Sequence, residues 1–271
     1  MFSLIPRVVA HLDPALLARV AGGLGGLPLP ALRARTRRQG RARIELLGDA
    51  PTREALESDA RAAARAHAVF LAETLAWLGG REPIVDGIDP RLRLRAPRGR
   101  LFVTLHRGNW LAAGGALAAA TGELHTVAGV QLHRAFSRAV VERLRAQGVI
   151  VHPGGAARET LGRVLEEGGQ VVLHLDGDPR REGRRARVPR GRSNGALRGV
   201  ARLAAESGAE VVFALCRREE PGRFRLEARW LTPPEPVTGR EWERTLHELL
   251  HAEVARHPEE WMIFRGPAEV R

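Results

Sequence analysis

Residues 100–256 alternate between short apolar runs and stretches of helical periodicity, and this alternation is the strongest constraint on the fold. The runs typical of strands are RLFVTLH (100–106), LHTVAGV (124–130), VIVH (149–152), GGQVVLHLD (168–176), AEVVFALC (209–216) and FRLEARWL (224–231). Helices are expected over 109–121, 133–147, 156–168, 193–207 and 239–256. Strands that alternate with helices of this length predict an α/β fold, in which a mostly parallel sheet is flanked by helices and FRLEARWL is antiparallel.

The chain is long enough for one large domain with a helical extension. It has 271 residues and is 44% hydrophobic, so it can bury a substantial core. A long helix is expected over 52–79, where Gly79 and Gly80 end the pattern. We therefore expect a helical N-terminal segment over 1–50 and a main domain over 51–271.

The N-terminal segment carries an apolar stripe followed by a basic cluster. Leu4, Val8, Leu12, Leu16 and Val20 recur every four residues. Asp13-Pro14 is typical of a helix N-cap followed by the first helical residue, which predicts two short helices. The basic cluster comprises Arg33, Arg35, Arg37, Arg38, Arg41 and Arg43. This arrangement suits docking on an anionic membrane surface, and the alternative is that the helices pack on their own domain with a solvated basic face.

Two kinds of N-terminal targeting element are not expected. Asp13 and Arg19 interrupt the apolar region that a cleavable signal peptide would need. No uninterrupted apolar run approaches the roughly 18–20 residues of a membrane-spanning helix.

The net charge of +12 predicts an anionic partner: nucleic acid, acidic lipid headgroups or an acidic carrier protein. Every basic residue except histidine is arginine, a bias that fits a GC-rich genome and weakens any argument from the number of arginines. Aromatic residues make up only 4% of the chain, and no helix-turn-helix or zinc-finger spacing is present, so nucleic acid is not the expected partner and a basic nucleic-acid-binding protein is the lesser alternative. The single cysteine, Cys216, excludes an internal disulfide and fits a reducing compartment.

Two of the predicted strands end in reactive side chains, His106 and Asp176. In open α/β sheets, ligands collect at the carboxyl ends of the strands. A histidine and a carboxylate from two strand ends can form a base with an orienting acid. Gly108 allows a close backbone approach, and Asn109 can cap the next helix. The alternative for His106 is an inert, half-buried imidazole.

No nucleophile with hydrolase spacing accompanies this pair. The chain has no Gly-x-Ser-x-Gly, and Cys216 falls within a strand. The base would therefore activate a hydroxyl of the substrate, which means group transfer without a covalent enzyme intermediate. Other histidines are scattered without a matched third ligand, so no metal is expected.

Four motifs in order resemble the bacterial lipid A biosynthesis acyltransferases, the late lauroyl and myristoyl transferases, whose relatives include mycobacterial phosphatidylinositol mannoside acyltransferase. LHRGNW (105–110) resembles the family's His-x-Gly-Asn-Trp-Glu signature. The other three are LEEGGQVVLHLDGD (165–178), RVPRGRSNGALRGVARLAAESGAEVVFAL (187–215) and HPEEWMIF (257–264). The resemblance implies a lysophospholipid (glycerolipid) acyltransferase-like fold over the main domain.

The resemblance also implies a reaction. A fatty acyl chain would pass from an acyl carrier protein or coenzyme A thioester to a hydroxyl of a glycolipid or lipid A-like acceptor. The protein would act peripherally at the cytoplasmic face of the inner membrane, without a cofactor. His106 takes the position of the general base, and Asp176 completes the dyad. The expected substrate-binding residues are Arg107, Gly108, Asn109, Trp110, Arg145, Arg158, Asp178, Arg187 and Arg190.

The sequence departs from the family pattern at two places. Five positions after His106 the family usually has Glu or Asp, and here the residue is Leu111. Either Asp176 supplies the only carboxylate, or the chain is an inactive homologue that binds lipid or carrier protein. The usual Phe-Phe-Gly segment is replaced by RREGRRARVPRGR (180–192), which could bind anionic groups of the acceptor, carrier or membrane, or form a solvated basic loop.

Overall fold

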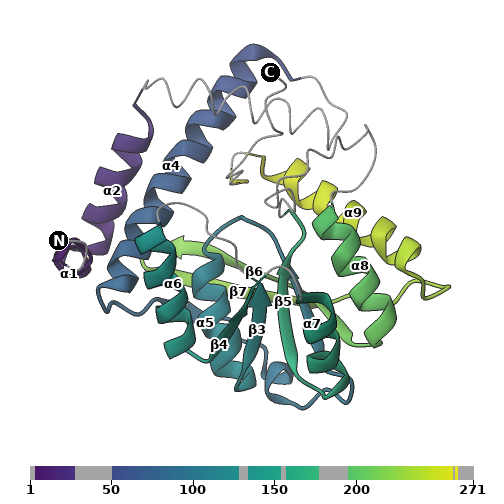
Figure 1. Ribbon diagram of the computed structural model, residues 1–271. Helices are drawn as coiled ribbons and strands as arrows, with labels where there is room; N and C mark the ends of the chain where they lie inside the picture. The colour runs from purple at the N-terminus through teal and green to yellow at the C-terminus, as the bar shows by residue number, and fades with distance from the viewer. Residues whose placement is uncertain are drawn as a thin grey trace.

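The chain forms an α/β fold around one twisted sheet, as the sequence predicts (Figure 1). The structure is a computed structural model that describes residues 4–27, 51–127, 134–153, 157–176, 195–258 and 260–261. The strands are β1 (Ile84–Asp86), β2 (Arg100–Thr104), β3 (Leu124–Val127), β4 (Val149–His152), β5 (Gln170–His174), β6 (Glu210–Glu220) and β7 (Arg223–Trp230). Their order across the sheet is β1-β7-β6-β2-β5-β3-β4, and every neighbouring pair is parallel except β6 with β7. The predicted antiparallel strand is thus confirmed.

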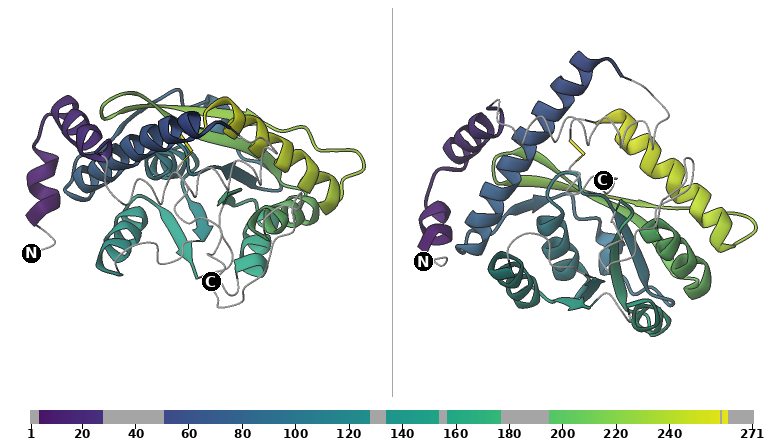
Figure 2. Two further views of the ribbon diagram at one scale, coloured as in Figure 1. Left: turned by 90° about the horizontal axis from the view of Figure 1, so that it is seen from above. Right: turned by 45° about the horizontal axis from the view of Figure 1, so that its top comes forward.

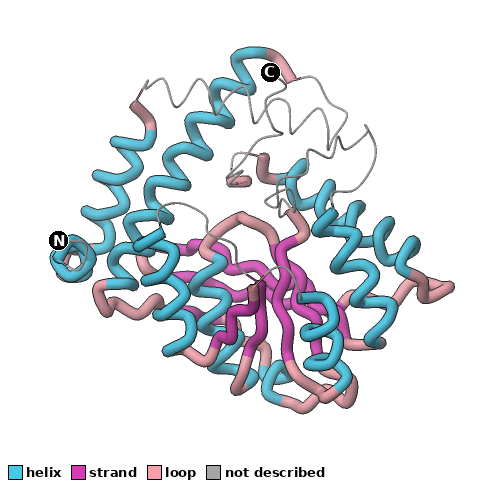
Figure 3. The backbone as a smooth tube through the Cα atoms, in the orientation of Figure 1, coloured by secondary structure: helices cyan, strands magenta, loops and turns pink. Residues whose placement is uncertain are grey.

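Helices cover both faces of the sheet (Figures 1 and 3). One face packs on α5 (Trp110–Thr121) and α6 (Arg134–Ala146), and the other packs on α7 (Ala157–Glu166), α8 (Gly195–Ser207) and α9 (Gly239–Arg256). Alternate residues of each strand point to opposite faces. In β2, Leu101 and Val103 therefore join the core under α7–α9, whereas Phe102 joins the core under α5.

The N-terminal helices lie against one long helix. They are α1 (Leu4–Ala10) and α2 (Pro14–Gly25), which pack on α4 (Arg53–Leu78) (Figure 2). The carboxylate of Asp13 accepts a hydrogen bond of 2.8 Å from the backbone N–H of Leu16, and Pro14 begins α2. The two predicted short helices and their cap are confirmed, and they pack on the rest of the chain. The basic cluster over 33–43 lies outside the described residues.

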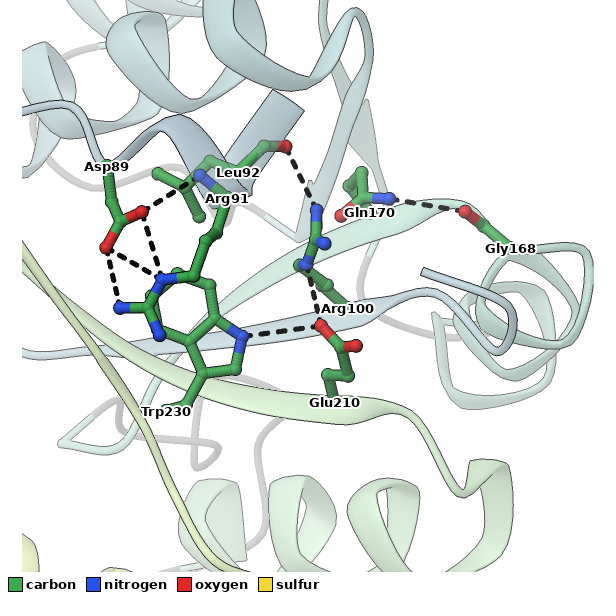
Figure 4. Close-up of polar contacts among 8 residues, drawn as sticks. All are labelled: Asp89, Arg91, Leu92, Arg100, Gly168, Gln170, Glu210 and Trp230. Carbon is green, nitrogen blue, oxygen red and sulfur yellow. Dashed lines mark hydrogen bonds and ion pairs between the residues drawn. The ribbon is translucent and has the colours of Figure 1, made fainter. Parts of the chain in front are cut away.

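The amino edge of the central strands is held by a buried arginine (Figure 4). Arg100, the first residue of β2, donates from Nε to Glu210 of β6 at 2.9 Å and from a terminal nitrogen to the carbonyl of Leu92 at 3.0 Å. The indole N–H of Trp230 donates to the same Glu210 carboxylate at 3.3 Å. These contacts fix the edge of β2 that lies opposite His106.

The sequence did not predict β1 or the short 3₁₀ helix η1 (Pro90–Arg93) that follows it. β1 has only three residues, too few to show a period of two. Its extended conformation comes from parallel pairing with β7, which is distant in the sequence.

Candidate active site

The register of two parallel strands brings His106 and Asp176 together. Thr104 of β2 lies opposite His174 of β5, and the backbone N–H of Leu175 donates to the carbonyl of Thr104 at 2.8 Å. Two residues beyond that pair, both chains leave the carboxyl edge of the sheet. Residues two apart in extended chains share a face, so the imidazole and the carboxyl emerge side by side on the α5 face.

The two side chains form a buried dyad. Nδ1 of His106 lies 2.9 Å from Oδ1 of Asp176, and the backbone N–H of His106 lies 3.2 and 3.0 Å from the two carboxylate oxygens. The indole N–H of Trp261 donates to Oδ2 at 2.8 Å. The side chains of His106 and Asp176 are only 12% and 3% exposed.

The carboxylate of Asp176 is ionised at physiological pH. Burial by itself would raise its pKa, but the neighbouring charge of His106 and the hydrogen bonds from His106 and Trp261 lower the pKa to about 2. An ionised carboxylate only accepts hydrogen bonds, so Nδ1 of His106 carries the proton and the basic lone pair lies on Nε2. This tautomer is the one that a general base requires.

The turn after β2 explains Gly108 and Asn109. Gly108 has φ of +63°, and a Cβ there would lie 2.0 Å from the carbonyl oxygen of Cys216 in β6. The N–H of Asn109 donates to that same carbonyl at 2.9 Å. The Asn109 side chain caps α5 by accepting from the N–H of Ala112 at 3.0 Å. Both residues therefore shape the backbone that presents His106.

The capping amide of Asn109 is itself held from α4. Its Nδ2 donates to Glu73 at 3.3 Å, and Arg218 of β6 donates two hydrogen bonds of 2.7 Å to the same carboxylate. This network, which the sequence did not predict, links α4 and β6 to the turn that carries His106.

An apolar pocket lies next to the dyad, between α5, α6 and the sheet. Its walls include Leu117, Val140 and Leu144, and the polar residues Thr104, Thr126, Ser137 and His174 also contribute to the lining. Trp110 belongs to the lining, and its ring centroid lies 5.0 Å from that of His106 with the planes nearly perpendicular. Phe70 of α4 stacks on Trp110 at 4.0 Å. The predicted site residue Trp110 thus joins the histidine to the pocket.

Leu111 occupies the position of the usual family acid. It lines the apolar pocket on the α5 face and also a second one formed by α2, α4 and α5. Asp176 provides the carboxylate at Nδ1 of His106, and an apolar residue at 111 suits its surroundings.

Arg107 is held by glutamates from the end of the chain. Its side chain is 5% exposed and donates to Glu253 of α9 at 3.0 Å and to Glu260 at 2.7 Å. These ion pairs give a structural role to a residue that was expected to bind substrate.

Arg145 and Arg158, also expected to bind substrate, do not converge on His106. Arg145 is exposed in the last turn of α6, which leads to the amino end of β4 and so lies at the edge of the sheet opposite the dyad. Arg158 is exposed and pairs with Glu206 at the end of α8. The remaining expected residues, Asp178, Arg187 and Arg190, lie outside the described residues.

Among the described residues, no group of three or more His, Cys, Asp or Glu side chains could hold a metal ion. Within the same part of the chain, no helix is long and apolar enough to cross a bilayer.

A histidine bound to a carboxylate, at the carboxyl edge of a mostly parallel sheet and beside an apolar pocket, is an arrangement that suits an α/β enzyme with amphipathic substrates. The family model "Bacterial lipid A biosynthesis acyltransferase" matches residues 86–266, and the chain belongs to this family. It is therefore an acyltransferase that acts on lipids.

Several solved structures match this chain significantly, and one of them is an acyltransferase. The crystal structure of the 1-acyl-sn-glycerophosphate (LPA) acyltransferase PlsC from Thermotoga maritima is 12% identical, with a TM-score of 0.39. The match covers 83% of this chain and 95% of that one. No curated protein matches the sequence significantly.

Proposed function

We propose that this protein transfers a fatty acyl chain from a thioester of acyl carrier protein or coenzyme A to a hydroxyl of a glycolipid or lipid A-like acceptor. The observation that supports this most directly is the 2.9 Å contact between His106 and Asp176 beside an apolar pocket. A thioester already activates its acyl group, so the enzyme needs a base for the acceptor and a site for the chain.

The proposed reaction has one proton path. Nε2 of His106 takes the proton from the acceptor hydroxyl, and the oxygen attacks the thioester carbonyl carbon. The C–O bond forms and the C–S bond breaks, and the imidazolium returns the proton to the leaving thiolate. Asp176 stabilises the imidazolium while it exists, and no covalent acyl-enzyme is formed.

The apolar pocket between α5 and α6 is the proposed site of the acyl chain. It lies on the face of the sheet where His106 and Asp176 emerge, and His174 and Trp110 contact both the pocket and His106. A chain lying there would place its carbonyl carbon next to the base, which is the proximity that the reaction requires.

The N-terminal segment, 1–50, is the proposed membrane-docking element, and 51–271 the acyltransferase domain. Four residues of the stripe, Val8, Leu12, Leu16 and Val20, are between 39% and 56% accessible, and Ile5, Leu24 and Leu27 nearby are between 46% and 60% accessible. Large apolar side chains exposed in a row on two helices mark an interaction surface. With a net charge of +12, docking would be peripheral, on the anionic cytoplasmic face of the inner membrane.

The test is acyl transfer to membrane lipid. Radiolabelled acyl-CoA and acyl-carrier-protein thioesters are incubated with vesicles of bacterial membrane lipid extract and wild type, His106→Ala or His247→Phe. His247 lies on α9 and serves as the control. Wild type and His247→Phe should form labelled lipid ester, and His106→Ala should lose activity at least about 1000-fold. Donor binding by wild type without turnover would instead identify an inactive homologue.

A further inference from the structure

A second histidine, His174, lies against the proposed base. It is the last residue of β5. It lies two positions before Asp176 in the chain, so the two side chains share a face of the sheet. Its ring stacks on that of His106 with centroids 4.2 Å apart and planes 18° from parallel. Trp110 meets both rings edge-on, at 5.0 Å from His106 and 6.2 Å from His174. The three rings form one cluster where the apolar pocket meets the dyad.

The imidazole of His174 has an unsatisfied nitrogen. Within the described part of the chain, Nε2 is buried and has no hydrogen-bond partner. A buried polar atom without a partner costs free energy, and an aliphatic or phenyl side chain would fill the same space without that cost. His174 lines a mostly apolar pocket, and an unsatisfied nitrogen on its ring points to a partner that arrives with the substrate.

The ring of His174 is neutral when the enzyme works. Burial lowers the pKa of His174 to about 3, with a further contribution from the charge of His106. The groups that face it are His106, which lowers its pKa, and Asp176, which raises it. A neutral imidazole carries one N–H, cannot compete with His106 for the acceptor proton, and adds no positive charge beside the imidazolium.

We propose that His174 is a further catalytic residue, whose Nε2–H donates a hydrogen bond to the carbonyl oxygen of the acyl thioester. This inference rests on the proposed acyl transfer. With its chain in the pocket, the donor places its carbonyl at the ring cluster, because the carbonyl carbon must lie within reach of the hydroxyl that His106 activates. The hydrogen bond strengthens as negative charge develops on the oxygen, and so it stabilises the transition state more than the bound donor.

Two substitutions at His174 distinguish the effect of its N–H from the effect of its aromatic ring. His174→Phe keeps an aromatic ring against His106 and removes the donor, whereas His174→Gln keeps an N–H at similar reach. With labelled acyl-CoA and membrane lipid vesicles, His174→Phe should lower kcat by about 100-fold to 1000-fold with little change in the KM for the thioester. His174→Gln should recover at least about tenfold of that loss, and His247→Phe should match wild type.

A structural role for His174 would give different results. Because His174→Phe removes an unsatisfied buried nitrogen, its Tm should equal or exceed that of wild type, and its pH–rate profile should keep its shape. Wild-type kcat in His174→Phe would overturn the inference. So would a loss shared equally by Phe and Gln with a lowered Tm, or a rate that recovers at another pH. If wild type transfers no acyl group, the proposed function fails as well, which distinguishes that failure from a failure at His174 alone.

Discussion

Trp261 and Asp176, 85 positions apart in the chain, are joined by a hydrogen bond of 2.8 Å from the indole N–H to Oδ2. The bond arrives from the end of the chain, where Glu260 also pairs with Arg107 beside His106. The segment after α9 therefore contacts Arg107 directly, through Glu260, and contacts His106 indirectly, through the hydrogen bond from Trp261 to Asp176. Oδ2 of Asp176 thus accepts from the indole of Trp261 and from the backbone N–H of His106, while Oδ1 binds the imidazole.

Removing that donor should weaken the dyad without removing it. Trp261→Phe keeps most of the ring packing, and a hydrogen bond to a charged group is worth about 1.5–3 kcal/mol. We expect the free energy of unfolding to fall by about that amount and the transfer rate to fall by about tenfold. Trp242→Phe is the matched control, since Trp242 is buried and its indole nitrogen has no hydrogen-bond partner among the described residues. Equal rates in Trp261→Phe and wild type would exclude a positioning role.

Gly108→Ala should disrupt the turn that presents His106. The residue has φ of +63°, and its Cβ would overlap the carbonyl oxygen of Cys216. We expect a loss of about 3 kcal/mol or more in unfolding free energy, measured by urea denaturation, together with loss of activity. Gly199→Ala in α8 meets nothing within 4 Å and should stabilise the protein by about 0.5–1 kcal/mol. A stable, active Gly108→Ala would contradict this view of the turn.

The stability of the protein should fall as the pH is lowered from about 6.5. Because burial lowers the folded-state pKa of His174 to about 3, the unfolded chain binds more protons between those two values, and unfolding becomes easier as pH falls. One such group changes the unfolding free energy by at most about 1.4 kcal/mol per pH unit. His174→Phe should therefore show a shallower decline between pH 6.5 and 4, and His247→Phe should keep the steeper one. Parallel curves for all three proteins would show that His174 is not buried in its neutral form.

Asp176 acts in a lower pH window. Its folded-state pKa of about 2 lies below the ordinary value of 3.8, so its contribution of about 2 kcal/mol is complete above pH 3.8 and is lost as the pH falls towards 2. Between pH 2 and 3.8, Asp176→Asn should flatten the stability curve, a change that urea denaturation across this range would measure. An unchanged slope would mean that the carboxylate is not held by the dyad.

The length of the accepted acyl chain should depend on Gly114. This residue of α5 lines the apolar pocket, and a Cβ there would lie 3.8 Å from Leu144 on the opposite wall. Gly114→Leu should fill the pocket and lower the rate with the longest accepted chain by about tenfold or more, while shorter chains keep most of their rate. Ala119→Leu, on the exposed side of the same helix, should leave the chain-length profile unchanged. A uniform loss across all chain lengths would place the acyl chain elsewhere.

The sequence predicted the parts of the fold and site that local pattern determines. Side chains at strand ends follow directly from the strand pattern, so the sequence predicts that His106 and Asp176 meet at the carboxyl edge of a mostly parallel sheet. The sequence also predicts the cap at Asp13 and the turn at Gly108, because glycine, proline and capping residues determine the conformation of their immediate neighbours.

Long-range packing determined what the sequence did not show. Trp261 belongs to the motif HPEEWMIF (257–264), but its contact with Asp176 depends on how the segment after α9 packs against the sheet. The stacking of His174 on His106 and the link from Glu73 to Asn109 likewise arise only in the folded chain. The family resemblance implies that Arg145 binds substrate, but the direction of α6 carries it to the opposite edge of the sheet.

The most direct measurement is a double-mutant cycle on the dyad, in which rates of acyl transfer to membrane lipid are compared for wild type, His106→Ala, Asp176→Asn and the double variant. Because the carboxylate acts through the imidazole, the double variant should be no slower than His106→Ala alone. Losses that multiply would show that the two residues act independently, and wild-type rates in either single variant would remove the dyad from the reaction.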